Sequence, residues 1–174
     1  MPDTAPIMIS EKRKINIVRL DTTVLENFAK AEMLIRKPVE EVFEAFVNPG
    51  ITTRFWFTKS TGRLDENDHV EWTWVMYNYT APVKVISIEI NKKIVIEWGS
   101  AEDATIIEWF FKSLNNGTFV SVVNSGFKGD ADKIIAQVRD STEGFTLVLA
   151  GLKALLEHNI RLNLVGDRFP SGLS

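Results

Sequence analysis

The chain has 174 residues, the length of a single domain of ordinary size. It holds 20 Lys and Arg against 23 Asp and Glu, a net charge of −3, which argues against a basic nucleic-acid-binding surface. It has no Cys and only two His, His69 and His158, so disulfides, thiolate metal sites and multi-histidine metal sites are excluded. We therefore expect no metal, no cofactor and no nucleic-acid partner.

No run of 18 apolar residues is present, so we expect no membrane span. The first residues carry acid early and lack an apolar stretch after a basic start, so no signal peptide is predicted and the expected location is cytoplasmic. Residues 1–27 are predicted to form an N-terminal extension or arm, and residues 28–174 a single domain.

Residues 29–38 alternate apolar and polar side chains, which predicts a strand that ends at Pro38. Val39, Val42, Phe43 and Phe46 then form one apolar stripe, which predicts a helix over 38–48. A second short helix is expected over 51–56.

Residues 57–126 have the pattern of consecutive strands. Val70, Trp72, Trp74 and Met76 share one parity, so all four are expected on one face of a strand. The alternation slips within residues 83–90, which a β-bulge or a change of the covered face would explain.

The strand pattern continues with apolar residues on one parity and turn residues between strands. Ile94, Ile96 and Trp98 are expected on one face, as are Ile107, Trp109 and Phe111 of the next strand. Asn115-Asn116-Gly117 between two strands predicts a tight hairpin.

Residues 130–162 change to a helical period, with Asp130 as the expected N-cap. Gly144 and Gly151 lie within this pattern and predict either a break near residues 140–144 or a close approach of the helix to another surface. Strands in one block with helices at its ends indicate an α+β protein with an antiparallel sheet. The apolar stripe of the long helix must then pack on the sheet.

Four segments resemble a known superfamily in their order and spacing: KPVEEVFEAFVNPGITTRFW, KKIVIEW, NNGTFVSVVNSGF and STEGFTLVLAGLKALLE. They are similar to the helix-grip domains, also called START-like or Bet v 1-like, and among these to the Hsp90-ATPase-activator homologue domains. The resemblance covers about residues 28–160. It implies a curved antiparallel sheet of about six or seven strands wrapped around a long C-terminal helix, with two short helices after the first strand.

The resemblance also implies an apolar cavity between sheet and helix, as in many members, and the family name implies chaperone regulation. The expected ligand contacts are the residues of the strands and of the long helix that face the space between them: Trp72, Trp74, Trp98, Trp109, Phe111, Phe145, Leu149 and Leu152. The alternative is that these side chains only fill a core.

No catalytic residue is assigned. Glu97 and Glu108 alternate with their neighbouring Trp and are expected to face outward. His69 follows an acidic loop, and His158 lies in the last turns of the long helix, where a cation is favoured by the helix dipole. Residues 163–170 are expected to fold back as a cap or to form a dimer surface.

The leading interpretation is a non-catalytic domain that binds a small apolar ligand, with a chaperone-linked regulator as a further expectation from the family name. One alternative is a cyclase- or hydrolase-type enzyme that uses a pocket acid and water. The other is a protein-interaction module with a filled core. The expected partners are accordingly a small apolar ligand, a chaperone-like protein or a second copy of the chain.

Overall fold

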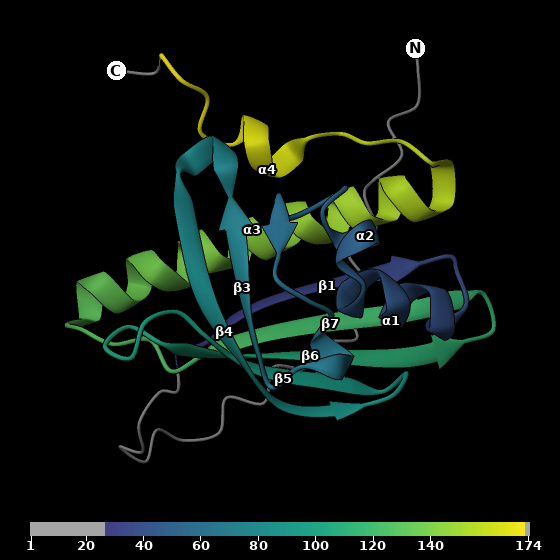
Figure 1. Cartoon of the computed structure of the whole chain (residues 1–174), viewed down its shortest axis with the longest axis horizontal. Coiled ribbons are helices and arrows are strands. Elements are labelled where there is room, and N and C mark those ends of the chain that lie inside the picture. Colours follow the sequence, from purple (N-terminus) through teal and green to yellow (C-terminus); the bar gives the residue numbers. More distant parts are fainter. Residues whose placement is uncertain (1–26, 173–174) are drawn as a thin grey trace, which may run out of the picture.

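The computed structural model describes residues 27–172 (Figure 1). The predicted N-terminal arm over 1–27 therefore lies, except for its last residue, outside the described part. The elements follow in chain order: β1 (Ala29–Ile35), α1 (Val39–Val47), α2 (Pro49–Thr52), β2 (Lys59–Ser60), the 3₁₀ turn η1 (Leu64–Glu66), β3 (His69–Trp74), the 3₁₀ turn η2 (Val75–Tyr77), β4 (Tyr79–Glu89), β5 (Lys93–Trp98), β6 (Thr105–Leu114), β7 (Gly117–Ser125), α3 (Ala131–His158) and α4 (Leu164–Asp167).

Within the described residues the strands form one seven-stranded sheet in the order β1-β7-β6-β5-β4-β3-β2, and all neighbouring pairs are antiparallel. The long helix α3 runs across the sheet and packs against β1, while β3 and β4 rise toward α4 (Figure 1). The α+β helix-grip architecture predicted from the sequence is therefore confirmed.

The β4 and β3 strands show one confirmed expectation and one error. The register of β4 against β5 shifts between Val85 and Ser87, so the predicted bulge is present. The prediction that Met76 continues the inward face of β3 is wrong. The strand ends at Trp74, the chain turns through η2, and Asn78 takes a left-handed conformation, which leaves Met76 exposed.

The predicted hairpin at Asn115-Asn116-Gly117 joins β6 to β7. Gly117 has a φ of +146°, and a Cβ atom built on it would lie 2.2 Å from the carbonyl oxygen of Ile35. Because β1 pairs directly with β7 at this point, the position requires a residue without a side chain.

The second short helix begins earlier than predicted and is shorter. Pro49 lies in the first turn of α2, and the Asn48 side chain accepts a hydrogen bond from the Gly50 amide at 2.9 Å, so the helix starts directly after α1. It ends at Thr52, whose buried hydroxyl donates to the Ala45 carbonyl at 2.7 Å. The sequence prediction of a helix over 51–56 is therefore wrong in its bounds.

Helix α3 is continuous from Ala131 to His158, so the predicted break near residues 140–144 is absent. The Asp130 side chain caps it by accepting from the Lys133 amide at 2.9 Å, as expected. The alternative explanation of the glycines, a close approach, fits the structure. A Cβ atom on Gly151 would lie 3.4 Å from the Phe55 carbonyl oxygen, and one on Gly144 would lie 3.1 Å from Arg168 Nη1.

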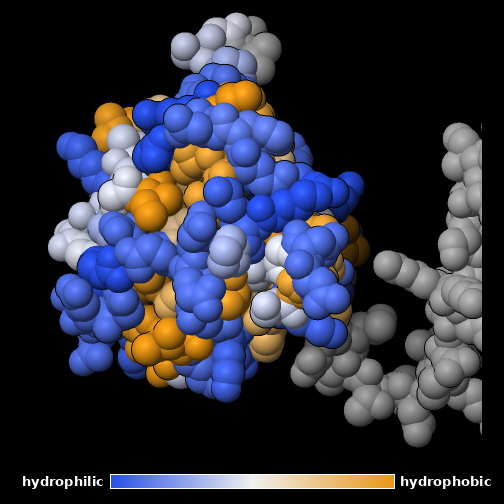
Figure 2. Space-filling view, turned by 90° about the vertical axis from the view of Figure 1, so that its right-hand side faces the viewer, coloured by the Kyte–Doolittle hydropathy of each residue, from blue (hydrophilic) through white to orange (hydrophobic). Residues whose placement is uncertain are grey.

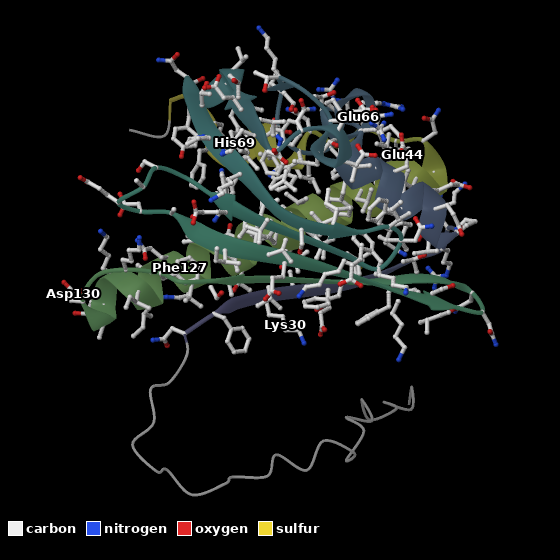
Figure 3. All side chains as sticks on the ribbon, turned by 60° about the horizontal axis from the view of Figure 1, so that its bottom comes forward. Lys30, Glu44, Glu66, His69, Phe127 and Asp130 are labelled. Atoms are coloured by element: carbon white, nitrogen blue, oxygen red, sulfur yellow. The ribbon has the colours of Figure 1, made fainter. Side chains whose placement is uncertain are left out.

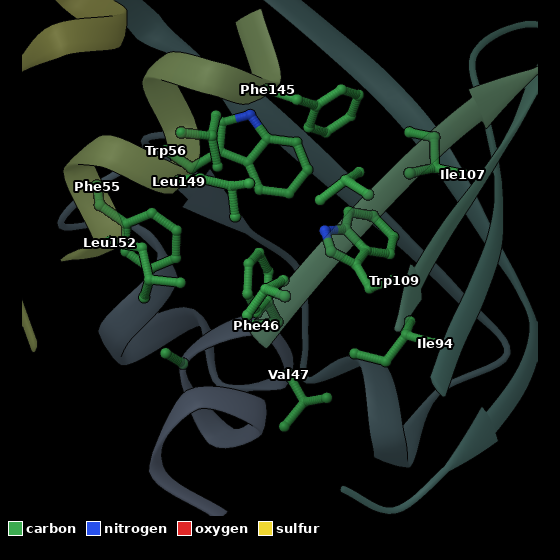
Figure 4. Close-up of a cluster of buried hydrophobic side chains, with 14 of the residues drawn as sticks. Phe46, Val47, Phe55, Trp56, Ile94, Ile107, Trp109, Phe145, Leu149 and Leu152 are labelled. Carbon is green, nitrogen blue, oxygen red and sulfur yellow. The ribbon is translucent and has the colours of Figure 1, made fainter. Parts of the chain in front are cut away.

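The core lies between the sheet, helix α1, the segment after α2 and the middle of α3 (Figure 4). Trp56 is its centre, with ring centroids 4.8 Å from Trp72, 5.9 Å from Trp109 and 5.7 Å from Phe145. Edge-to-face arrangements of this kind add to the stabilisation from burial. None of the helices in residues 27–172 is long and apolar enough to cross a membrane.

Candidate functional site

A pocket of about 670 Å³ lies between strands β3 to β7 of the sheet, α3 and the C-terminal segment. One side is aromatic and is formed by Trp56, Trp74, Tyr77, Trp98, Phe145 and Phe169. This volume is within the range of small-molecule pockets, roughly 300–1,000 Å³. The sheet and α3 therefore border a partly open pocket at one end of their interface and a filled core at the other.

The residues predicted to contact a ligand are divided between these two regions. Trp74, Trp98 and Phe145 line the pocket. The other five belong to the buried core and do not line it: Trp72, Trp109, Phe111, Leu149 and Leu152. They face inward as predicted, but aromatic side chains of α1 and the following segment cover them, as Phe46 does with Trp109 and Phe111.

The opposite side of the pocket is polar and belongs mainly to α3. Gln137, Asp140, Ser141 and Gly144 follow one another at helical spacing and all border the pocket. The Ser141 hydroxyl donates to Asn124 Oδ1 at 2.9 Å, and the Asn124 amide donates to the Ile106 carbonyl at 2.9 Å. These two side chains are thus already paired within the protein.

The C-terminal segment forms one wall of the pocket, and we call residues 160–169 the cap. Arg168 is its main anchor. Its Nη2 atom lies 2.8 Å from Asp140 Oδ1 and 3.2 Å from Glu143 Oε2, both on α3. Tyr77 binds the other side, because its hydroxyl donates to the Val165 carbonyl and its ring meets Phe169 edge-on at 5.9 Å. The predicted fold-back of this segment is therefore observed, and its predicted role as a dimer surface stays a prediction.

Three polar atoms among the pocket-lining residues are buried and have no hydrogen-bond partner: Trp98 Nε1, Gln137 Oε1 and Arg168 Nε. Trp98 Nε1 and Arg168 Nε are donors, and Gln137 Oε1 is an acceptor. Buried polar groups in folded proteins are nearly always paired. The core residue Trp109 also has an unpaired Nε1 atom, so the lack of a partner is not confined to pocket-lining residues.

The candidate acids and histidines lie elsewhere. Glu108 forms an outer-face ion pair with Lys93 at 2.7 Å, and both His side chains are exposed. In Figure 3, His69 and Glu44 lie on the upper part of the molecule, whereas Phe127 and Asp130 lie at the start of α3. No group of three His, Asp or Glu within the described residues could hold a metal ion.

Glu44 is instead part of a structural cluster. Its carboxylate accepts two hydrogen bonds from Arg63, at 2.8 and 3.1 Å, and these bonds hold the pKa of Glu44 below its ordinary value. Arg63 also bonds Asp65 at 2.8 Å, so the acidic loop after β2 is fixed by an arginine and not by a cation.

Sequence reasoning missed the pocket residues Trp56, Tyr77, Val165, Arg168 and Phe169. Trp56 was assigned to a short helix, and no periodic pattern marks the others. One signal was available, since the mixture of apolar and charged residues after the long helix allowed a cap.

On the face shown in Figure 2, hydrophobic residues form small groups separated by hydrophilic ones.

The fold and the pocket together define a helix-grip domain. Residues 36–157 match the family model described as Activator of Hsp90 ATPase homolog 1-like protein. This match spans more than half of the chain, and the chain belongs to that family. The cap lies beyond the matched residues.

Solved structures agree with this assignment. The protein SSP2350 from Staphylococcus saprophyticus is 28% identical, with a TM-score of 0.68 over 78% of this chain and 95% of that chain. The Aha1 dimer from Colwellia psychrerythraea is 15% identical, with a TM-score of 0.62 over 75% of this chain and 96% of that one.

DynU16, a protein of the dynemicin biosynthetic locus, has a TM-score of 0.68 at 14% identity. The match covers 78% of this chain and 49% of that chain. Likeness at such low identity, here and for the Aha1 dimer, shows the fold alone. No curated protein matches the chain.

Proposed function

We propose that this protein binds a small, uncharged and largely apolar molecule in the pocket, without converting it chemically. The observation that carries the proposal is the aromatic pocket of about 670 Å³ between the sheet, α3 and the cap. A filled core, which the interaction-module alternative needs, is hard to reconcile with a cavity of this size. The walls are apolar, and a few polar groups at one side would orient a ligand.

The charges at the pocket favour an uncharged ligand. Asp103 and Asp140 border it, and its only lining cation among the described residues, Arg168, is already bonded to Asp140 and Glu143. An anionic ligand would face carboxylates, and the energy of transferring its charge from water would not be recovered.

Two probes that share one aromatic body test this proposal. N-phenyl-1-naphthylamine is neutral, and 8-anilino-1-naphthalenesulfonate adds a sulfonate to the same body. We expect the neutral probe to bind the native protein and quench tryptophan emission, and the anionic probe to bind at least about tenfold more weakly because of the carboxylates. A native protein that binds neither probe contradicts the proposal.

Trp74→Phe and Trp72→Phe are a matched pair of variants, since both residues lie on β3 with the same parity. Only Trp74 lines the pocket. We expect Trp74→Phe to weaken binding of the neutral probe about threefold to tenfold, as for loss of one aromatic contact. Trp72→Phe should leave the dissociation constant unchanged. Equal effects of both variants would place the probe outside the pocket.

The polar side of the pocket supports a second candidate, an enzyme that uses a pocket acid and water. Asp103 is the more available carboxylate, because its contact with Lys133 is long, at 4.0 Å, whereas Asp140 is bonded to Arg168 at 2.8 Å. The Asp103→Asn variant separates the two functions. It should leave binding of the neutral probe intact, whereas it would abolish turnover of a substrate if Asp103 were a general base.

The family description supports a chaperone partner as a further candidate. The measurement is the ATPase rate of a purified Hsp90-type chaperone with and without this protein. A rate that rises with protein concentration to saturation supports the candidate, and an unchanged rate contradicts it.

A further inference from the structure

The cap contributes two apolar side chains to the wall of the pocket. Val165 and Phe169 both line it, and Phe169 is 59% exposed, so a molecule in the pocket can contact this ring. The Phe169 ring also meets the ring of Tyr77, another lining residue, at a centroid distance of 5.9 Å. This side of the pocket therefore exists only while the cap lies on the domain.

A chain of contacts joins this wall to a carboxylate outside the pocket. Glu143 Oε2 lies 3.2 Å from Arg168 Nη2, and the guanidinium carbon of Arg168 lies 4.8 Å from the centre of the Phe169 ring. A guanidinium at this distance is attracted to an aromatic face. Asp140, the second partner of Arg168, lines the pocket, whereas Glu143 does not. Glu143 thus reaches the pocket through Arg168 and the cap.

The docking of the cap rests on a small number of contacts. None of the four residues of α4 is buried, and both carboxylate partners of Arg168 are exposed. An exposed ion pair changes an equilibrium by at most about fivefold. The loss of one such pair, or the gain of a contact with a ligand, therefore shifts the fraction of molecules in which the cap is docked.

We propose that ligand binding and docking of the cap are coupled, and that Glu143 is a positioning residue for the ligand because it holds Arg168, and with it Phe169, at the pocket. The inference rests on the proposed function and concerns the regulation of that same pocket. A ligand that contacts Val165 and Phe169 binds the docked state more tightly and stabilises it. The coupling is reciprocal, so a change that weakens docking of the cap also weakens ligand binding.

Amide hydrogen exchange measures the coupling in the native protein. Saturating N-phenyl-1-naphthylamine should slow the exchange of residues 160–169 by at least about fivefold, the lower end of typical coupling between two sites. The 3₁₀ turn η1 is the internal control. Its residues do not line the pocket, so its exchange should not change.

Charge changes at Glu143 test its role from outside the pocket. Glu143→Gln removes one ion pair of Arg168, and Glu143→Lys adds repulsion. We expect the affinity for the neutral probe to fall about threefold for Glu143→Gln and about tenfold for Glu143→Lys, with faster exchange of the cap in the same order. Because the probe is uncharged, these substitutions have no direct electrostatic effect on it.

Asp132→Asn and Asp132→Lys are the matched controls, because Asp132 is an exposed acid of α3 that does not line the pocket. They should leave the affinity for the probe unchanged. At about 1 M sodium chloride the differences between the native protein and the Glu143 variants should shrink, since salt screens exposed charges. A loss of affinity caused by damage to the helix would persist in salt.

Three results would overturn the coupling and leave the apolar pocket standing. The first is a probe that binds the native protein without slowing exchange of the cap. The second is equal affinity of the Glu143 and Asp132 variants for the probe, and the third is a loss of affinity in the Glu143 variants that salt does not reduce. A native protein that does not bind the neutral probe overturns the proposed function itself, and the coupling with it.

Discussion

Trp72 and Trp74 show how two inward-facing residues of one strand differ in their surroundings. Trp72 stacks on Phe57 with a centroid distance of 4.6 Å and is enclosed by the core. Two residues further on, Trp74 lies where β3 ends and borders the pocket. The alternation of the strand decides that both residues face inward. Whether each residue borders the core or the pocket depends on which other segments pack against it.

Substitution of Leu149 tests which residues of α3 belong to the filled core. It is fully buried in the middle of α3, so we expect Leu149→Ala to lower the free energy of unfolding by about 2–5 kcal/mol. Leu147→Ala is the matched control, because Leu147 lies on the same helix but borders the pocket, where a void already exists. Urea unfolding measures both. A cost for Leu149→Ala no larger than that of the control would mean that the filled core lies elsewhere.

The shifted pKa of Glu157, near the end of α3, allows a prediction of how the stability of the fold depends on pH. Burial alone would raise the pKa of this carboxyl, but the hydrogen bonds from Lys153 at 2.5 Å and from the Arg36 amide at 2.7 Å outweigh it, and the pKa is lowered. A carboxyl with a lower pKa in the folded state stabilises the fold above its unfolded pKa, and this contribution is lost as the pH falls through the folded value.

We therefore expect Glu157→Gln to destabilise the protein by about 1.5–3 kcal/mol at pH 7, the range for hydrogen bonds to a charged group. The difference between variant and native protein should shrink as the pH falls below the ordinary carboxyl value of 4.5. Urea unfolding at a series of pH values between 7 and 3 provides the measurement. A difference that stays constant over this range would show that the charge of Glu157 does not stabilise the fold.

At the scale of elements, the cap is held to the domain by few contacts. Arg168 bonds two carboxylates of α3, and the Tyr77 hydroxyl bonds the Val165 carbonyl. The short helix α4 has four residues and none of them is buried, so it has little intrinsic stability. Its position on the pocket thus depends on the packing of Val165 against the core and on the side-chain bonds made by Arg168 and Tyr77.

Removal of the Arg168 charge should loosen the cap selectively. We expect Arg168→Gln to speed amide hydrogen exchange of residues 160–169 about tenfold, while exchange in the middle of α3 is unchanged. In the native protein, amide exchange in the cap should also be faster at high salt than at low salt. Salt screens the ion pairs of Arg168 because its partners, Asp140 and Glu143, are exposed. The variant should lack this salt effect. Arg139→Gln is the control, because Arg139 is an exposed arginine of α3 that does not line the pocket. Equal exchange in both variants would contradict an ionic anchor.

At the scale of the whole molecule, one sheet and one helix form a core and a pocket from the same face. The half toward α1 and α2 is filled, because Phe46, Phe55 and Trp56 are inserted between sheet and helix. The other half receives no such insertion and is bordered by the cap. The volume between sheet and α3 is therefore divided by two segments, the one between β1 and β2 and the cap after α3.

The sequence by itself determined the strands, the long helix with its Asp130 cap, the bulge in β4 and the Gly117 hairpin. It could do so because hydrophobic period, capping side chains and glycine conformations act over a few neighbouring residues. It also determined which side chains face inward, including Trp74, Trp98 and Phe145 of the pocket. The sequence prediction erred in the bounds of α2, which the Asn48 cap and the Thr52–Ala45 hydrogen bond set. For the glycines of α3 the sequence left a break or a close approach open, and contacts with Phe55 and Arg168 decided for the close approach.

Only the tertiary structure decided which inward residues border a cavity and which fill the core. Cavity volume is the space that remains after every segment has packed, so it depends on Trp56, from the segment after α2, and on the cap, which are far apart in sequence. The pairing of Arg168 with Asp140 spans 28 residues and has no periodic signal. The unpaired atoms of Gln137 and Arg168 likewise become visible only once all other hydrogen bonds have formed.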